Sequence, residues 1–345
     1  MIAPESVVWF VVPEGFDDPE RVSGGSVYDQ RVGAELRRIG WDVRTVETPA
    51  GDAGGDPFER VPDGGLVLVD GLVAICAPDA IEAAACRVRV VALVHMAAAA
   101  FADVDDGTVE GERRALPHAH RVIVASEWLK DELVRRGLST PGRLVVARPG
   151  SDAAVSAAEG TSSGASLLCV GVVAPHKGQD TLVEALAELG SQTEWTCTFA
   201  GSVTSEHDFA ARVAAQAAEA GISERITWAG VLSAHELDAA YAGADVLIAP
   251  SRTESYGIAV GDALRRGIPV IASRVGGIPE AAHPPDAAIL VPPQDRRALG
   301  DALRRWIEDP ALRATMSTAA RRAAPSRTRW TDTARTIHTA LAGLS

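Results

Sequence analysis

The sequence predicts an α/β protein made of two doubly wound units, each a parallel sheet covered by helices on both faces. The chain of 345 residues exceeds the usual size of one domain. Short apolar runs alternate with Ala-rich helical segments, as in parallel sheets. A stretch rich in Ser, Gly, Ala and Thr interrupts this alternation at residues 151–166 and is typical of a linker. We therefore predict domains at 1–155 and 167–326, with a linker at 156–166.

The apolar runs of the first half have the length of strands and are separated by segments of helical length. We predict strands at residues 7–12, 42–46, 66–69, 88–95, 121–125 and 144–147, with helices at 26–40, 78–86 and 127–137.

The second half repeats the pattern after the linker. We predict strands at residues 167–172, 196–200, 226–228, 246–250 and 269–273, with helices at 180–189, 209–220, 296–308, 311–323 and 331–341. Ligands of open parallel sheets bind beyond the carboxyl ends of the strands, so we expect the ligand crevice between the two domains.

Composition excludes several classes of protein. The formal net charge of −13 argues against a nucleic acid partner and favours no more than weak association with membranes. No apolar run reaches the ~20 residues of a membrane span, and the first residues do not resemble a signal peptide, so we expect a cytoplasmic protein. The four cysteines form no C-x-x-C pair, which favours buried thiols over a disulfide framework or a zinc site.

The most informative motif spans residues 251–262 and follows the apolar run at 245–250. The pattern predicts a strand, a turn and a helix start, with Glu254 at the turn and Asp262 two turns into the helix. Because a helix rises about 1.5 Å per residue, positions eight apart lie roughly 12 Å apart, the reach of a nucleotide-sugar. One carboxylate could bind sugar hydroxyls and the other ribose hydroxyls, while the N–H groups of residues 256–258 face the diphosphate. Glu254 could equally be a plain capping carboxylate.

Three further candidates lie at the end of a predicted strand or in a segment that leads from a strand into a helix. Lys177 follows the strand at 167–172, where an ammonium could meet a diphosphate, or it could be an ordinary surface lysine. Gly24 and Gly25 precede the helix at 26–40 and either admit a ligand to the backbone or make a turn. His95 ends the strand at 88–95 and is either structural or faces the crevice.

Taken in order, these segments resemble the retaining glycosyltransferases of family 4, which have the GT-B fold of two Rossmann-like domains facing across a cleft. The resemblance covers nearly the whole chain. It is carried by Gly24-Gly25, Arg148-Pro149-Gly150-Ser151-Asp152, Lys177-Gly178, Trp228-Ala229-Gly230, residues 250–262 and Val275-Gly276-Gly277-Ile278-Pro279-Glu280.

The resemblance implies a role for each matching residue. Glu254 would contact the donor sugar and support the reacting centre, Lys177 would neutralise the leaving diphosphate, and His95 would lie near the donor sugar. The remaining residues would bind substrate: Gly24, Gly25, Leu232, Ser255, Tyr256, Gly257, Ile258 and Asp262, the last through the ribose hydroxyls. It also implies an acceptor-side N-terminal domain, a nucleotide-sugar-binding C-terminal domain, and a helix at 327–345 that crosses back to the N-terminal domain.

Two positions depart from the family pattern. Asp262 stands where the second glutamate of the family's E-x7-E signature is expected and is one methylene shorter, which affects the fit of the ribose. Val172 stands where many relatives have an arginine, so Lys177 would be the main charge against the diphosphate unless Arg252 turns inward.

The expected activity is transfer of a sugar from a UDP- or GDP-sugar to a small-molecule or glycan acceptor, with retention of configuration. Lys177 and the helix start would stabilise the charge that develops on the diphosphate, so no metal and no cofactor is expected and the nucleotide-sugar is a co-substrate. Front-face attack, with the leaving phosphate taking the acceptor proton, fits the lack of an obvious carboxylate nucleophile. The alternatives are a nucleotide-sugar epimerase or sugar phosphorylase on the same scaffold, and a non-catalytic nucleotide-sugar-binding or scaffolding protein.

Overall fold

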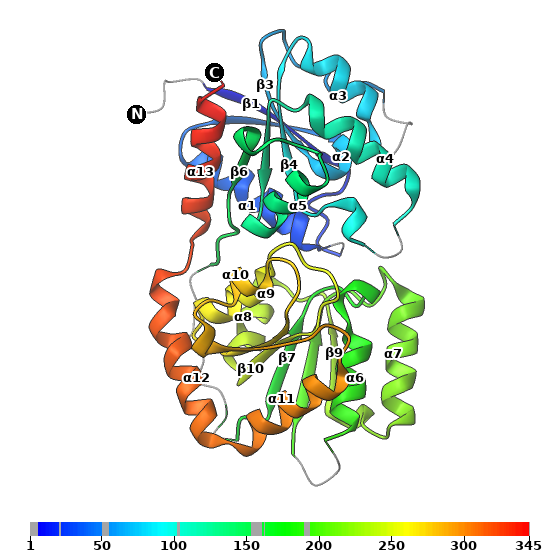
Figure 1. The fold of residues 1–345 in the computed structure, drawn as a ribbon, viewed down its shortest axis with the longest axis vertical. Helices are drawn as coiled ribbons and strands as arrows, with labels where there is room; N and C mark the ends of the chain where they lie inside the picture. The colour runs from blue at the N-terminus through cyan, green and yellow to red at the C-terminus, as the bar shows by residue number, and fades with distance from the viewer. Residues whose placement is uncertain are drawn as a thin grey trace. The chain divides into compact units, whose positions relative to one another are not determined.

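The computed structural model describes residues 6–20, 22–49, 55–101, 104–152, 161, 163–189 and 194–344. The chain forms two compact α/β units, shown as ribbons in Figure 1. One unit comprises residues 1–18, 25–150 and 328–345, and the other comprises residues 19–24 and 151–327. The segment predicted as a linker, 156–166, lies largely outside the described residues.

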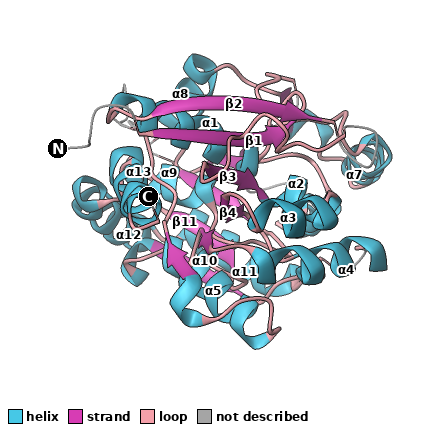
Figure 2. Ribbon diagram, turned by 90° about the horizontal axis from the view of Figure 1, so that it is seen from above, coloured by secondary structure: helices cyan, strands magenta, loops and turns pink. Residues whose placement is uncertain are grey.

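The first unit is built on a six-stranded parallel sheet with the strand order β2-β1-β3-β4-β5-β6. Figure 2 shows β2, β1, β3 and β4 next to one another. The strands are β1 (Val7–Pro13), β2 (Asp42–Thr48), β3 (Leu66–Asp70), β4 (Arg89–Val94), β5 (Arg121–Val124) and β6 (Leu144–Val146). The helices are α1 (Gly24–Arg38), α2 (Gly71–Cys76), α3 (Pro78–Ala85), α4 (Asp106–Ala115), α5 (Glu127–Arg135) and α13 (Trp330–Ala342).

The second unit is built on another six-stranded parallel sheet, with the order β12-β11-β10-β7-β8-β9. Its strands are β7 (Ser166–Val170), β8 (Thr196–Ala200), β9 (Ile226–Gly230), β10 (Val246–Ala249), β11 (Val270–Ser273) and β12 (Ala288–Val291). Its helices are α6 (Gln179–Ala187), α7 (His207–Glu219), α8 (Ala234–Ala242), α9 (Ile258–Arg265), α10 (Ile278–Ala281), α11 (Arg296–Glu308) and α12 (Pro310–Ala323).

The predicted fold class is confirmed, because both sheets are parallel and covered by helices. Central strands such as β3 are buried at every position, which explains why they read as continuous apolar runs rather than alternating ones. Each unit has its own core, centred on β7, β8 and β10 in one and on β1, β3, β4 and β5 in the other. The predicted burial of the thiols holds for Cys169 and Cys197 but is wrong for Cys76 and Cys86, which are exposed at helix ends.

Helix α13 belongs to the first unit although it lies at the far end of the chain, and it packs beside β6 (Figure 1). The Trp330 ring meets the edge of Tyr28 at a centroid distance of 5.6 Å. The indole Nε1 of Trp41 donates a hydrogen bond to Nδ1 of His338 at 3.1 Å, and the Thr333 hydroxyl donates to the carbonyl of Arg148 at 2.7 Å. No helix among the described residues is long and apolar enough to cross a membrane.

Candidate active site

The strand order of each sheet indicates where a ligand site can form. Numbered along the chain within its unit, the second sheet has the order 3-2-1-4-5-6, and the first has the order 2-1-3-4-5-6. In both, the direction of winding reverses at the first strand, so the adjoining connections leave on opposite faces and open a crevice at the carboxyl ends. The reversal falls between β7 and β10 in the second unit and between β1 and β3 in the first.

The second unit places Lys177 and Glu254 together at this reversal. Lys177 ends the short 3-10 helix η5 (Pro175–Lys177) after β7, and Glu254 lies in the loop after β10. The Nζ of Lys177 donates a hydrogen bond to Oε2 of Glu254 at 2.6 Å, with 24 % and 15 % of the two side chains exposed. The pair is therefore partly desolvated but still open to a ligand. Lys177 is neither unpaired nor an ordinary surface lysine.

Backbone contacts hold the two loops against each other. The N–H groups of Arg252 and Thr253 both donate to the carbonyl of His176, at 2.8 and 3.3 Å. Gly178 has a φ of +70°, and a Cβ there would overlap the carbonyl oxygen of Pro250. The close approach of the two loops therefore requires glycine at this position.

The loop after β11 supports Glu254 from another side. The N–H of Gly277 donates to the carbonyl of Glu254 at 3.1 Å. A Cβ on Gly276, whose φ is +52°, would overlap the same carbonyl. The Gly276-Gly277 pair thus allows this loop to fix the backbone of Glu254, and it accounts structurally for a motif that the sequence could only mark as family-like.

The segment from Ser255 to Ile258 leads into helix α9. Ser255 and Tyr256 are buried, Gly257 precedes the helix with a φ of +97°, and Ile258 is its first residue. The first backbone bond of the helix joins the N–H of Gly261 to the carbonyl of Gly257 at 3.1 Å. The N–H groups of the first helical turn precede this ladder, so the helix start offers donors and a positive partial charge to an anion.

The predicted placement of Asp262 two turns into the helix is wrong. Because α9 begins at Ile258, Asp262 is its fifth residue, and Glu254 lies in the loop before the helix. The helical rise therefore does not set the distance between the two carboxylates. Oδ1 of Asp262 lies 3.9 Å from the guanidinium of Arg266, whose closer partner is Asp238 at 3.1 Å. Leu232 lies half-buried between β9 and α8.

Arg252 does not supply the charge that an arginine at position 172 would supply. Its guanidinium donates to Oδ2 of Asp180 at 2.6 Å and to the carbonyl of Pro175 at 2.7 Å, which ties it to the start of α6. The carbonyl of Val172 accepts from the Gln179 amide at 2.8 Å. Burial, together with the Lys177 charge, lowers the pKa of His176 to about 4, so this imidazole is neutral at physiological pH.

The first unit places His95 in a cluster with two carboxylates that the sequence analysis did not single out. Nε2 of His95 lies 2.9 Å from Oδ1 of Asp29 and 3.2 Å from Oδ2 of Asp70. Asp29 comes from α1, Asp70 from the end of β3 and His95 from the end of β4, so the cluster sits at the carboxyl edge of the sheet, beside its reversal. The other oxygen of Asp70 accepts the N–H of Leu72 at 2.7 Å and caps α2.

The cluster changes the pKa of each member. Burial lowers the pKa of His95, but the attraction and hydrogen bonds of Asp29 and Asp70 outweigh it and raise the pKa to about 10. Burial raises the pKa of Asp29 to about 7 against the opposing effect of His95. Burial by itself would raise the pKa of Asp70, but the hydrogen bond and the charge of His95 bring this pKa below its ordinary value. The Nε2 of His95 and one carboxylate oxygen from each aspartate lie within 4.8 Å of one another and are atoms that can coordinate a metal ion. However, the Nε2–O distances of 2.9 and 3.2 Å are those of a hydrogen-bonded ion pair.

The glycine pair starts α1 instead of preceding it as predicted, since the helix already begins at Gly24. A Cβ on Gly25 would lie 3.1 Å from Cδ2 of His95, so the helix start approaches the imidazole ring closely. Asp29 follows one helical turn after Gly25, on the same face. The position of Asp70 directly after a buried strand, like that of His95, was the available signal for this cluster; nothing in the sequence singled out Asp29.

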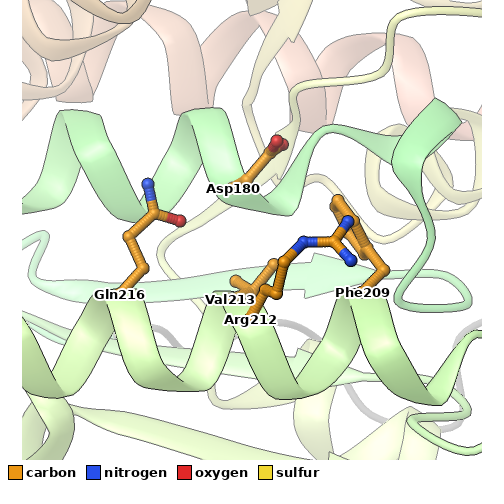
Figure 3. Close-up of a pocket in the computed structure, with 5 residues that line it drawn as sticks. All are labelled: Asp180, Phe209, Arg212, Val213 and Gln216. Carbon is orange, nitrogen blue, oxygen red and sulfur yellow. The ribbon is translucent and has the colours of Figure 1, made fainter.

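A surface hollow of about 300 Å³ lies between α6 and α7 in the second unit. Figure 3 shows Asp180 projecting from one helix and Phe209, Arg212, Val213 and Gln216 from the other. The guanidinium of Arg212 lies over the Phe209 ring at 5.4 Å. None of the predicted site residues lines this hollow.

Two units, each with a six-stranded parallel sheet covered by helices, have the architecture of the GT-B fold, and comparison with known structures supports this class. Sucrose-phosphate synthase from Thermosynechococcus elongatus aligns with a TM-score of 0.80 at 22% identity, covering 97% of this chain and 98% of that one. Alr3699/HepE from Anabaena, solved with UDP-glucose, aligns with a TM-score of 0.76 at 17% identity, covering 98% and 99%.

Sequence comparison identifies the family. Residues 159–323 match the family model described as "Glycosyl transferases group 1", and this part of the chain belongs to that family. The D-inositol 3-phosphate glycosyltransferase of Saccharomonospora viridis is 33% identical over 229 residues, covering 62% of this chain and 53% of the relative. The chain thus spans about half the length of the curated relatives that it matches here.

Proposed function

We propose that this chain is a retaining glycosyltransferase that moves a sugar from a nucleoside diphosphate sugar to a small-molecule or glycan acceptor in the cytoplasm. The observation that carries the proposal is the 2.6 Å pair of Lys177 and Glu254 at the reversal of the β7–β12 sheet. Such a reversal beside a helix start is a common site for nucleotides. The donor carries the two groups that this pair complements, an anionic diphosphate and a hydroxylated sugar.

In this proposal the two side chains separate when the donor binds. The ammonium of Lys177 moves onto the diphosphate, and Glu254 accepts hydrogen bonds from sugar hydroxyls. Negative charge on the diphosphate grows as the glycosidic bond breaks, so Lys177 and the start of α9 stabilise the transition state more than the ground state. These groups supply the charge that a divalent ion provides elsewhere, and we propose a metal-independent reaction with no cofactor.

Retention is proposed to follow from front-face attack. The leaving phosphate takes the proton of the acceptor hydroxyl as the new bond forms on the face that the phosphate leaves. Gly277 holds Glu254 through its backbone, and once Lys177 has moved to the diphosphate the carboxylate accepts hydrogen bonds from the sugar hydroxyls. We therefore assign Glu254 to binding and orienting the sugar rather than to forming a covalent intermediate. Asp262 is proposed to bind the ribose, and Leu232 to contact the base.

UDP-sugars are the first donors to test, since Anabaena HepE was solved with UDP-glucose, and GDP-sugars are the second set. A ligand that binds only the folded chain raises its melting temperature, because binding adds to the free energy of unfolding. The gain is about 2.7 kcal/mol when the ligand concentration is 100 times its Kd. The donor found in this way is then assayed with acceptor mixtures for release of nucleoside diphosphate matched by glycosylated product. Release without glycosylated product would indicate hydrolysis and contradict the proposal.

The residue assignments are tested with Lys177→Ala and Glu254→Ala. The chain contains only one other lysine, Lys130, which forms a surface pair with Glu127 at 3.1 Å, so Lys130→Ala is the matched control. We expect kcat/KM to fall at least about 100-fold in the two site variants, in line with the loss of one group that stabilises developing charge, and to be unchanged in the control. Full turnover in both site variants would refute the assignment. Turnover lost to a chelator and restored by a divalent ion would refute metal independence.

A further inference from the structure

The side chain of Arg252 reaches from the loop after β10 to the loop that carries Lys177. Its Nη1 donates a hydrogen bond to the carbonyl of Pro175 at 2.7 Å, and its Nη2 donates to Oδ2 of Asp180 at 2.6 Å. The backbone N–H of Arg252 donates to the carbonyl of His176 at 2.8 Å. This one residue therefore holds the two carbonyls of η5 that immediately precede Lys177.

These contacts lie beside the ion pair of the candidate site. Arg252 comes two residues before Glu254, and Pro175 comes two residues before Lys177. The long side chain of Lys177 is flexible, so the place of its ammonium depends on where its backbone is held. The Arg252–Asp180 pair is suited to hold it, because 26 % and 27 % of the two side chains are exposed and a partly buried pair is screened less than a surface pair.

The arginine is anchored to a helix whose start is itself fixed. Asp180 projects from the first turn of α6 (Figure 3), next to Gln179, which is fully buried. The Gln179 amide donates to the carbonyl of Val172 at 2.8 Å and so joins the start of α6 to the loop after β7. Both terminal nitrogens of Arg252 donate to η5 and α6, so the planar fork that could grip a phosphate is directed to the protein instead.

We propose that Arg252 is a positioning residue that acts on the donor through Lys177. By joining η5 to the loop after β10, it sets where the Lys177 ammonium lies relative to Glu254, and thereby the affinity of the site for the diphosphate. Arg252 itself does not contact the diphosphate. The effect on the diphosphate rests on the proposed function, whereas the effect on Lys177 is a property of the free chain.

The first test follows Lys177 by NMR in the chain without ligand. Labelling with isotope-enriched lysine gives only two sets of side-chain signals, because Lys130 is the other lysine of the sequence. Glu254→Ala supplies the signals of a released Lys177. We expect Arg252→Ala to move the Lys177 signals toward those positions while the Lys130 signals stay in place. Lys177 signals that remain at their wild-type positions would overturn the proposal, whether or not the chain transfers sugar.

The second test distinguishes positioning from direct attraction of the diphosphate, by calorimetric titration with UDP and then with GDP. Asp180→Ala removes the carboxylate that holds Arg252 and leaves the positive charge of Arg252 in place. Direct attraction would become stronger in this variant, because a negative charge has been removed. Positioning predicts the opposite: the Kd of the nucleoside diphosphate should rise roughly tenfold in both Arg252→Ala and Asp180→Ala, since a small misplacement of a charged group is costly. An unchanged or tighter Kd in Asp180→Ala would overturn the proposal, and this variant decides the matter where Arg252→Ala is too unstable to titrate.

A double-mutant cycle shows whether Arg252 acts through Lys177. In the Lys177→Ala background, Arg252→Ala should change the Kd by less than about twofold, because the group that it positions is gone. An equal loss in both backgrounds would mark a merely structural effect and overturn the inference.

Arg313→Ala is the matched control. Arg313 on α12 donates to the carbonyls of Trp306 and Ile307, at 3.0 and 2.5 Å, in the same unit but outside both loops. It should lower stability in urea without changing the Kd or the Lys177 signals, and a loss of binding equal to that of Arg252→Ala would overturn the proposal. Failure of the wild-type chain to bind either nucleoside diphosphate would instead refute the proposed donor, and the NMR signals would still decide whether Arg252 places Lys177.

Discussion

Gly178 joins the loop that carries Lys177 to the loop that carries Glu254, and replacing it with alanine tests how tightly the two are coupled. Its φ of +70° is unfavourable for any residue with a Cβ, and a Cβ there would overlap the carbonyl of Pro250, a backbone atom that cannot turn away. The first effect costs about 1–2 kcal/mol. The overlap adds about 1–3 kcal/mol, so Gly178→Ala should lower the free energy of unfolding by roughly 2–5 kcal/mol in total.

The chain offers a matched control for the backbone effect. Gly221 has a φ of +69°, but a Cβ there would meet no atom within 4 Å. Gly221→Ala should therefore show only the cost of the left-handed conformation, about 1–2 kcal/mol. The difference between the two variants then measures the contact between the loops.

Unfolding in urea, followed by tryptophan fluorescence and circular dichroism, gives both free energies, and calorimetric titration with UDP gives the second readout. We expect Gly178→Ala to weaken nucleotide binding because relief of the overlap moves Lys177 away from Glu254, while Gly221→Ala leaves binding unchanged. Equal stability losses in the two variants, or unchanged UDP binding in Gly178→Ala, would refute the reasoning.

Two further predictions concern the stability of the first unit. The folded His95 has a pKa of about 10 and the unfolded one about 6.5, so its stabilising effect is complete below pH 6.5 and is lost as the pH rises through 10. Asp29, whose pKa burial raises to about 7, also takes up a proton on folding and adds to this fall, and loss of His95 alone would raise its pKa further. Urea unfolding between pH 6 and 9 should therefore show stability falling with pH in the wild type and a flatter dependence in the double variant Asp29→Asn/His95→Gln; an identical slope would contradict this. Tyr28→Phe removes the 2.7 Å hydrogen bond to Ala147 and should cost about 1–2 kcal/mol in the same assay; a change below about 0.5 kcal/mol would show that the bond contributes little.

The sequence predicts best the helices and strands whose burial requires a recognisable pattern of apolar residues. Buried strands such as β1 and β10 read as apolar runs because both faces of a parallel sheet are covered. Strand β12 is missed because it is a four-residue edge strand, largely half-buried, that follows two prolines. Helix α2 is missed because it has only six residues, too few to show a helical period, and follows β3 without a separating loop.

The residues of the candidate site also include some that the sequence predicts and some that it does not. Glu254 and Lys177 are predictable because each lies in a loop that follows an apolar run with the pattern of a buried strand. The partners of His95 are not, because Asp29 lies 66 residues away on a helix and meets the histidine only through the lateral order of β1, β3 and β4. Local sequence patterns carry no information on that strand order. The start of α9 at Ile258, which puts Asp262 one turn into the helix instead of two, depends on the left-handed backbone conformation of Gly257, which the sequence pattern does not show.

The return of α13 to the first unit has a consequence for how this chain is made. A ribosome releases residues 1–150 long before it reaches Trp330, yet the surface that receives this helix, including Tyr28, Trp41 and the carbonyl of Arg148, belongs to that early segment. The first unit can therefore begin to fold during synthesis but cannot finish until the second unit has emerged. An early segment expressed alone would expose an apolar seam to chaperones, and joining residues 1–150 directly to 328–345 is the natural way to obtain this unit in isolation.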